Sequence, residues 1–279
     1  MAKMLVREPS PKLTGAPDGG RGPVDFKRAH RQWTNYVKTV TNAGWDPVVV
    51  PLTAPCPEGV FIEDLVFVYQ DVAILTRPSV LSRRFEALGV RESIEPLGYS
   101  LHKIEAPGTL EGGDLLTVGD DIYVGYGGAS NAEGIGQLRA ILKPTGANII
   151  AIPTGPTRHL KSALSALPDG SLIGYPPLVA EPELFTDLHP VPEARGANVV
   201  LLGENRVLMA ANCRASAAVV AGLGFEVVPV DISEFVVPVD ISEFQKRDAD
   251  VTCLSVLLPD RAVSTVPHPS VAHDDAVTV

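Results

Sequence analysis

The sequence predicts an α/β propeller made of five hairpin–helix–strand units, and three observations lead to this fold class. Pairs of short apolar runs joined by turn residues recur along the chain at intervals of roughly 45 residues. Most pairs are followed by a helical pattern and a third apolar run. The strand patterns left over at the two ends of the chain would close a fifth unit across the termini. No residue motif recurs from one unit to the next, so the prediction rests on the type and order of the elements.

The N-terminal segment supplies part of the fifth unit: a strand at MLVRE, a Gly/Pro-rich loop over residues 10–23, a helix, and a strand at DPVVVPL. The helix is expected between Val24 and Gly44, because apolar residues fall there at helical spacing and glycine is a common C-terminal stop. These apolar residues are Phe26, Ala29, Trp33, Tyr36, Val37 and Val40.

Four units follow in order, and each begins with a predicted hairpin. The hairpins are expected at residues 59–75, 110–127, 159–175 and 197–211, the third with an Asp-Gly turn. The helices that follow them are expected at residues 81–89, 131–146, near 182–188 and 214–224. Closing strands are expected at residues 100–107, 148–153 and 225–231, and a strand within 250–259 completes the fifth unit. A single catalytic domain would span residues 1–259, and the tail at 260–279 is expected to be disordered because it lacks periodicity.

The composition excludes several classes of partner. The chain has 279 residues, is 45% hydrophobic and carries a net charge of −10, which predicts binding to neither nucleic acids nor membranes. No apolar run reaches the length of a membrane span, and the start lacks the apolar stretch of a signal peptide. Cys56, Cys213 and Cys253 are odd in number and far apart, which predicts neither a disulfide framework nor a zinc site. A cytoplasmic protein is therefore expected.

Polar residues stand at the starts of the predicted hairpins. In a closed ring, these corresponding positions all point toward the axis, so side chains far apart in sequence would converge in one pocket. The residues are Glu63 and Asp64 in the first hairpin, Glu111 and Asp114 in the second, His159 in the third, and Cys253 in the fifth unit.

This set has a chemical logic. A cysteine attacks poorly unless its thiolate is favoured, a histidine can protonate a leaving amine and then activate water, and a carboxylate can orient the imidazole. Further carboxylates predict a cationic substrate, since a planar guanidinium pairs with them in bidentate fashion. The residues thus indicate thiol-based hydrolysis at a cationic C–N centre.

Taken singly, each residue also has a structural interpretation. Cys253 lies in an apolar strand and could be an inert core residue, and His159 could be a hydrogen-bonded structural histidine. The EGGD sequence at residues 111–114 could be a turn whose glycines adopt unusual backbone angles. Glu63 and Asp64 are harder to explain in this way, because carboxylates within an apolar strand need partners. The combination favours a site.

The motifs FIED, TRP…SRR, IEAPGTLEGGD, NAEG, HLKS and VTCLSV, in this order, resemble those of the dimethylarginine dimethylaminohydrolases. That family belongs to the guanidine-modifying pentein superfamily, whose fold is a five-bladed α/β propeller, and the resemblance covers roughly residues 4–258. It implies hydrolysis of Nω-methylated arginines, asymmetric dimethylarginine and monomethylarginine, to citrulline and dimethylamine or methylamine, with no cofactor and no metal. It further implies that Cys253 forms a covalent thiouronium, that His159 is the acid and then the base, and that Glu111 orients His159.

The resemblance also implies contacts with a small guanidine substrate. The implied substrate-binding residues are Glu58, Glu63, Asp64, Arg83 and Arg247. The loop around residues 10–23 matches the family's mobile lid, and its Gly/Pro content suits a flap that excludes water. A homodimer is compatible with the sequence.

Two substitutions depart from the family pattern. Ala129-Ser130-Asn131 stand where the family has Arg-Thr-Asn, so an arginine that grips the substrate α-carboxylate is missing, and Glu58 replaces the usual aspartate. The loss keeps two alternatives open: another guanidine hydrolase, such as an arginine or agmatine deiminase, and a guanidine-binding relative with impaired catalysis.

The third departure is a tandem duplication, since Val227–Phe235 and Val236–Phe244 are identical nine-residue copies. A shift of the strand by an odd number of residues would turn its core side chains outward, so one copy is expected to keep the native pairing. The other is expected to form a loop, which closure entropy tolerates.

Overall fold

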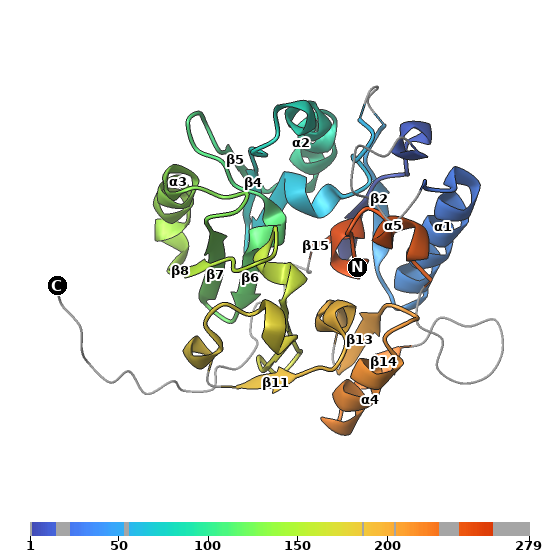
Figure 1. The fold of residues 1–279 in the computed structure, drawn as a ribbon. Helices are drawn as coiled ribbons and strands as arrows, with labels where there is room; N and C mark the ends of the chain where they lie inside the picture. The colour runs from blue at the N-terminus through green and yellow to red at the C-terminus, as the bar shows by residue number, and fades with distance from the viewer. Residues whose placement is uncertain are drawn as a thin grey trace.

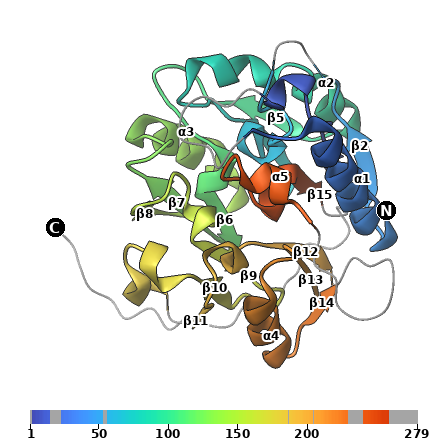
Figure 2. The same ribbon diagram turned by 45° about the vertical axis from the view of Figure 1, so that its right-hand side comes forward.

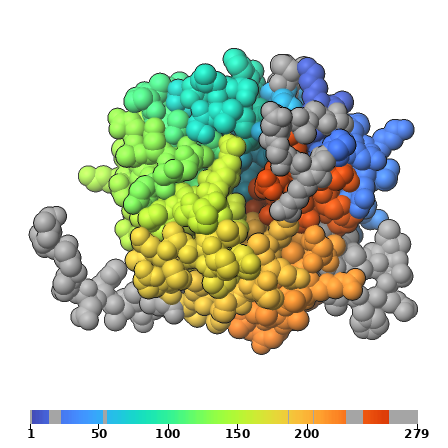
Figure 3. All heavy atoms as spheres, in the orientation of Figure 1, coloured from blue at the N-terminus to red at the C-terminus, as the bar shows by residue number. Residues whose placement is uncertain are grey.

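Five three-stranded sheets follow one another around a central axis in the computed structural model, which describes residues 2–14, 23–52, 56–185, 187–203, 205–228 and 240–258 (Figures 1 and 2). In each sheet the middle strand pairs antiparallel with one neighbour and parallel with the other. The predicted α/β propeller of five units is therefore confirmed. The blades appear in chain order around the surface, and the red segment near the C-terminus meets the blue N-terminal one (Figure 3).

Four blades are formed by consecutive segments. Their strands are β3 (Val66–Tyr69), β4 (Val72–Leu75) and β5 (Ser100–Lys103); β6 (Leu115–Val118), β7 (Asp121–Tyr126) and β8 (Asn148–Pro153); β9 (Leu164–Ala166), β10 (Leu172–Gly174) and β11 (Leu188–Pro190); and β12 (Val199–Gly203), β13 (Arg206–Met209) and β14 (Glu226–Val228).

The fifth blade closes the ring across the termini, as the sequence predicts. It contains β15 (Ser255–Leu258), β1 (Lys3–Val6) and β2 (Asp46–Val49). Lys3 is paired with Leu258 on its antiparallel side and with Asp46 on its parallel side.

The helices α1 (Phe26–Asn42), α2 (Val90–Ile94), α3 (Ala132–Leu142) and α4 (Arg214–Gly222) lie on the outside of the ring (Figure 1). In α1 the side chain of Asp25 caps the first turn by accepting the Arg28 N–H at 3.0 Å. Trp33 and Tyr36, one turn apart, are buried against the first core cluster. Gly44, with φ +102°, supplies the left-handed backbone just beyond the helix end.

Two predicted helices are wrong in type. Residues 81–89 contain a 3₁₀-helix, η3 (Leu81–Ala87), before the short α2. A 3₁₀-helix stacks residues i and i+3 directly, and this brings Arg83 within 3.0 Å of Glu86 on the buried side. Near residues 182–188 only a 3₁₀ turn forms, η9 (Pro182–Leu184), after another at η8 (Pro176–Leu178). Prolines that lack an N–H favour such short turns over a continuous α-helix.

A short 3₁₀ turn precedes the first strand of every blade and points toward the axis. The turns are η2 (Ile62–Leu65), η5 (Gly112–Asp114), η7 (Leu160–Ser162), η10 (Ala194–Ala197) and η11 (Val251–Leu254). Each contacts the next in the series η11, η2, η5, η7 and η10. We call this set the turn ring; it brings the starts of the predicted hairpins together.

The first strands of the five blades line a cavity of about 240 Å³. One residue from each is Val66, Leu115, Ser165, Val199 and Ser255. Glu63 and Lys161 also line it, and these two residues come from the turn ring. The cavity therefore adjoins the set of predicted site residues.

The two ends of the duplication have different roles. Val227 and Val228 of the first copy end β14, which is paired with β13, while Ser242–Phe244 of the second copy begin α5 (Ser242–Gln245). The loop predicted between them falls on residues 229–239, outside the described residues, as do most of the predicted lid and the tail at 260–279. Within the described residues, no helix combines the length and apolar character needed to cross a bilayer.

Candidate active site

The centre of the site is a hydrogen-bonded pair from consecutive blades. His159 and Glu111 are the N-cap residues of η7 and η5, and both have extended backbone that directs the side chain toward the axis. The His159 Nε2 atom lies 2.8 Å from Oε2 of Glu111. We call these two residues the catalytic pair; both are buried.

The glycines of EGGD are required by close packing, not by unusual backbone angles. A Cβ atom on Gly113 would lie 2.6 Å from Nδ1 of His159, and one on Gly112 would lie 1.9 Å from the carbonyl oxygen of Glu63. Neither glycine has a positive φ. The motif does form a turn, η5, as one interpretation had it, but the unusual backbone angles expected of its glycines are wrong. The absence of a side chain makes room for the imidazole and for the neighbouring blade.

The environment of the pair favours the ionised form of both side chains. Oε1 of Glu111 accepts the Ser79 N–H at 3.0 Å and its hydroxyl at 2.9 Å, and Oε2 also accepts from Nη2 of Arg158 at 3.1 Å. Burial would raise the pKa of Glu111, but His159 and Arg158 together hold it well below its ordinary value. Burial would likewise lower the pKa of His159, but Asp64 and Glu111 raise it to about 9. The imidazole is therefore charged at neutral pH.

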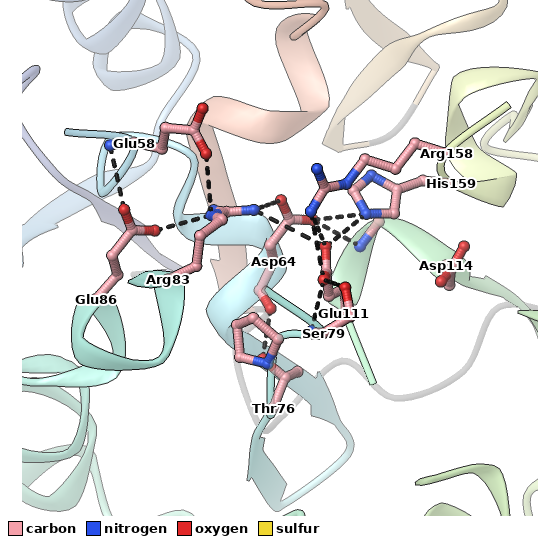
Figure 4. A network of polar contacts seen from close by, with 12 residues as sticks. Glu58, Asp64, Thr76, Ser79, Arg83, Glu86, Glu111, Asp114, Arg158 and His159 are labelled. Carbon is pink, nitrogen blue, oxygen red and sulfur yellow. Dashed lines mark hydrogen bonds and ion pairs between the residues drawn. The ribbon is translucent and has the colours of Figure 1, made fainter. Parts of the chain in front are cut away.

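Arg83 lies between two groups of carboxylates (Figure 4). Nη1 is 2.7 Å from Asp64, and Nε is 3.0 Å from Glu86 and 3.4 Å from Glu58. Its Nη2 atom is buried without a hydrogen-bond partner among the described residues. A buried donor left in this state is one that a ligand oxygen can satisfy.

Two other predicted substrate-binding residues contact each other. The Arg247 guanidinium forms an ion pair with the carboxylate of Glu58, which is one-quarter exposed. Glu58 thereby joins Arg247 to Arg83, and the three side chains line one side of the site. A cationic group of a substrate that binds Glu58 would therefore replace these arginines as its ion-pair partner.

Glu63 has a partner that the sequence analysis did not identify. Its carboxylate lies 2.6 Å from Nζ of Lys161, and both residues line the cavity of the first strands. Asp64 thus pairs with Arg83, whereas Glu63 pairs with Lys161 at the boundary between the site and the cavity.

Cys253 is the third residue of η11 and is half-buried. Its N–H donates to the Asp250 carbonyl at 3.2 Å, and the Tyr36 hydroxyl donates to the carbonyl of Val251 at 3.1 Å. Burial, followed by the charges of Glu63 and Asp64, raises the pKa of the Cys253 thiol well above its ordinary value. The thiol thus shares its electrostatic environment with the carboxylates of η2.

Asp64, Glu111 and His159 offer three ligand atoms within 4.8 Å of one another. A divalent cation does not fit this set, because Nη1 of Arg83 already lies 2.7 Å from Asp64 and 3.8 Å from Glu111. The imidazole nitrogen nearest to these carboxylates is also engaged with Glu111. The three potential ligand residues are instead arranged around cationic side chains of the protein itself.

The fourth blade contributes a residue that sequence reasoning missed. Nη1 of Arg195, in η10, lies 3.0 Å from Oδ1 of Asp250, and Nη2 donates to the Gln245 carbonyl at 3.0 Å. Arg195 thus joins its own turn to the segment that leads to Cys253. Arg195 lies in a turn between the start of a hairpin and the axis, as the other site residues do. This shared position could have identified it from the sequence.

Ala129 is buried, and the glycine before it lies close to the backbone of Arg158. A Cβ atom on the preceding Gly128 would lie 2.7 Å from the carbonyl oxygen of Arg158. The side chain of Arg158 is 49% exposed, which leaves its guanidinium accessible from the site while one edge contacts Glu111. The glycine that precedes position 129 therefore packs against the backbone of Arg158, a residue of the following blade.

No family model matches the chain, but curated proteins and solved structures do. The chain is 47% identical to the N(G),N(G)-dimethylarginine dimethylaminohydrolase of Streptomyces coelicolor over 92% of its own length and 96% of that protein. It is 32% identical to the enzyme of the same name from Pseudomonas aeruginosa, covering 91% and 98% of the two chains. The solved structure of a cysteine-to-serine mutant of the Pseudomonas aeruginosa enzyme with citrulline superposes with a TM-score of 0.82 at 31% identity, covering 92% of this chain and 98% of that one.

Proposed function

The chain belongs to the dimethylarginine dimethylaminohydrolase family, and from this premise we propose that it hydrolyses asymmetric dimethylarginine and monomethylarginine to citrulline and dimethylamine or methylamine. Cys253 is the nucleophile, His159 the general acid and then the base, and Glu111 orients the imidazole. The observation that carries these assignments is the buried His159–Glu111 pair, in a turn ring that also holds Cys253.

The first step forms a bond between the Cys253 sulfur and the guanidinium carbon. In the empty site the raised pKa keeps the sulfur as a thiol. A guanidinium bound beside Glu63 and Asp64 offsets their negative charge, which favours the thiolate, and the thiol proton leaves to solvent. Substrate binding therefore activates the nucleophile.

The second step breaks the bond to the methylated nitrogen. His159, with its pKa at about 9, is an imidazolium at neutral pH and donates a proton to the leaving amine. Dimethylamine departs and a covalent thiouronium remains on Cys253. Glu111 stays ionised and stabilises the imidazolium that the step requires.

The third step releases citrulline. The neutral imidazole now accepts a proton from water, whose oxygen attacks the thiouronium carbon. The C–S bond breaks, which returns Cys253 and His159 to their starting forms once the sulfur is protonated.

Charge complementarity assigns the substrate contacts. Asp64 and Glu63 face the guanidinium, and Glu58 receives the α-amino group after exchange with its arginine partners, Arg83 and Arg247. Arg83 keeps one donor for the ligand, and the half-exposed Arg158 supplies a cation for the α-carboxylate. This arrangement favours an intact amino acid over a decarboxylated guanidine such as agmatine.

Product analysis tests the proposal. The parent chain should form equal amounts of citrulline and dimethylamine from asymmetric dimethylarginine, while Cys253→Ser should form neither and Cys213→Ala, a matched cysteine removal, should keep the activity. Ammonia from arginine or agmatine, without dimethylamine, would instead identify a deiminase. A homodimer and a cytoplasmic location remain predictions, to be checked by light scattering and cell fractionation.

A further inference from the structure

Asp114, the last residue of EGGD, is fully buried and is not used by the proposed reaction. Its Oδ2 atom accepts the Ser130 hydroxyl at 2.6 Å, and its Oδ1 atom accepts the backbone N–H of Leu160 at 3.1 Å. A Cβ atom on Gly125 would lie 2.7 Å from Oδ1, so a glycine in β7 makes room for this carboxylate. Both oxygens are therefore held in a fitted position.

Each of these contacts leads to one member of the catalytic pair. The Ser130 oxygen accepts the backbone N–H of Glu111 at 3.2 Å, and Leu160 directly follows His159 in the chain. One carboxylate thus fixes the backbone of both residues, although they belong to different blades. Asp114 lies on the side of the pair that is away from Arg83 (Figure 4).

The directions of these bonds require an ionised carboxylate. The Ser130 hydroxyl donates its proton to Asp114, which leaves its oxygen free to accept from Glu111. A protonated Asp114 would bring a second donor into the cluster and lose acceptor capacity. Either the Ser130 hydroxyl or the new carboxyl proton would then lack an acceptor, and the link to Glu111 would weaken.

On the basis of the proposed function, we propose that Asp114 is a positioning residue whose ionised carboxylate holds Glu111 and His159 in alignment, and that its protonation at mildly acidic pH lowers the activity. The charged groups that face it are the imidazolium of His159, which favours the ionised form, and the carboxylate of Glu111, which opposes it. Burial is the largest influence and raises the pKa of Asp114 to about 6. Titration therefore falls in a range that a neutral-pH enzyme can encounter.

The variant Asp114→Asn keeps the shape but cannot ionise. It should lower kcat by about ten- to a hundredfold with little change in KM, because the bonds lost act on the catalytic pair and not on the substrate. The acidic limb of the kcat profile, centred near pH 6 in the parent, should be absent. Ser130→Ala should give a smaller loss and Ser130→Thr, which restores a hydroxyl, should recover it.

Stability separates positioning from a purely structural role. Because burial raises the folded-state pKa of Asp114, the ionised form costs stability above about pH 6, and Asn removes that cost. Asp114→Asn should therefore raise the melting temperature near pH 8 while it lowers kcat. A fall in both quantities, or an unchanged kcat and acidic limb, would overturn the proposal.

One readout does not depend on turnover. The imidazole of His159, followed by NMR in histidine-labelled protein, should shift its titration in Ser130→Ala, which breaks the link from Asp114 to Glu111 but keeps the Asp114 charge that itself raises the pKa of His159. If the parent hydrolyses no methylarginine but this shift occurs, the proposed substrate fails and the positioning role stands. An identical His159 titration in parent and variant would refute the positioning role whatever the substrate.

Discussion

The His159 imidazole and the Glu111 carboxylate are 48 residues apart in the chain and 2.8 Å apart in space, because each caps the turn that opens one of two consecutive blades. This spacing is the blade repeat itself. A ring that places equivalent positions side by side can therefore assemble a catalytic pair from residues that share no local sequence.

Glu111→Gln should separate the role of the carboxylate from that of the imidazole. Loss of the negative charge lowers the pKa of His159 from about 9 toward its ordinary value, so the basic limb of kcat should move to lower pH. We expect kcat near neutral pH to fall by roughly 100- to 10,000-fold. The profile is measured by citrulline formation, with the exposed Glu133→Gln as control. An unchanged basic limb would contradict the assignment.

The same pair predicts how stability depends on pH. His159 has a raised folded-state pKa, so its contribution is fully present below the unfolded pKa of about 6.5 and is lost as pH rises through about 9. Between about pH 6 and about pH 8, the free energy of unfolding should fall by about 2 kcal/mol. Urea titrations measure this fall. His159→Gln should flatten it, and an equal slope in the variant would assign it to other groups.

Cys253 should be slow to alkylate in the absence of substrate. Its raised pKa predicts that the rate of carboxamidomethylation keeps rising with pH beyond the range in which an ordinary thiol levels off. Glu63→Gln removes one of the charges responsible and leaves the Lys161 cation nearby, so labelling should move to lower pH. Mass spectrometry of the labelled peptide identifies the site. Rapid labelling of the parent at neutral pH would show an activated thiolate without substrate.

The fold could be predicted from the pattern of apolar residues and turns, because every blade repeats the same order of elements. The helix at 214–224 and the strand patterns at the termini could be located from apolar spacing alone. The segment at 81–89 could not, because Arg83 pairs there both with Glu86 in the same turn and with Asp64, which lies 19 residues earlier in the chain. The local spacing of apolar residues does not predict which side chains pair with residues distant in the chain.

The site was predictable to a similar depth. Cys253, His159 and Glu111 were identified by residue type and position, and the structure places all three in the turn ring or at its caps. The partner of Glu63 was not identified. Lys161 pairs with Glu63, as a buried carboxylate requires, but the sequence alone does not show which of its cations lies close enough.

Arg158 should carry the charge that position 129 lacks. Arg158→Ala should raise KM for asymmetric dimethylarginine by roughly ten- to a hundredfold, because a charge-assisted contact to the α-carboxylate is lost. Ala129→Arg in that background should restore KM, since it returns an arginine to the position where the family pattern has one. Steady-state kinetics with the decarboxylated analogue of asymmetric dimethylarginine, which keeps the dimethylguanidinium but has no carboxylate, provide the control. An equal loss with both substrates would show that Arg158 acts only through its contact with Glu111 and does not bind the α-carboxylate.

Removal of one copy of the duplication should leave the enzyme working. Deleting residues 227–235 or 236–244 gives the same chain, in which one copy supplies both the end of β14 and the start of α5. Ile241 and Phe244 fill the core, where the Phe244 ring meets that of Phe61 edge-on at 6.4 Å. The single remaining copy keeps both side chains and keeps Gln245 and Arg247 at the same spacing from Cys253.

The extra nine residues therefore lengthen the connection between β14 and α5. Loop-closure entropy predicts that the shortened chain gains less than about 2 kcal/mol in free energy of unfolding and changes kcat by no more than roughly threefold. Urea unfolding and citrulline formation, compared between the parent and the deletion variant, measure both quantities. A gain of activity far beyond that range would show that the duplication impairs the Cys253 segment, because the only change lies upstream of α5. A chain that no longer folds would show instead that β14 and α5 each require their own copy.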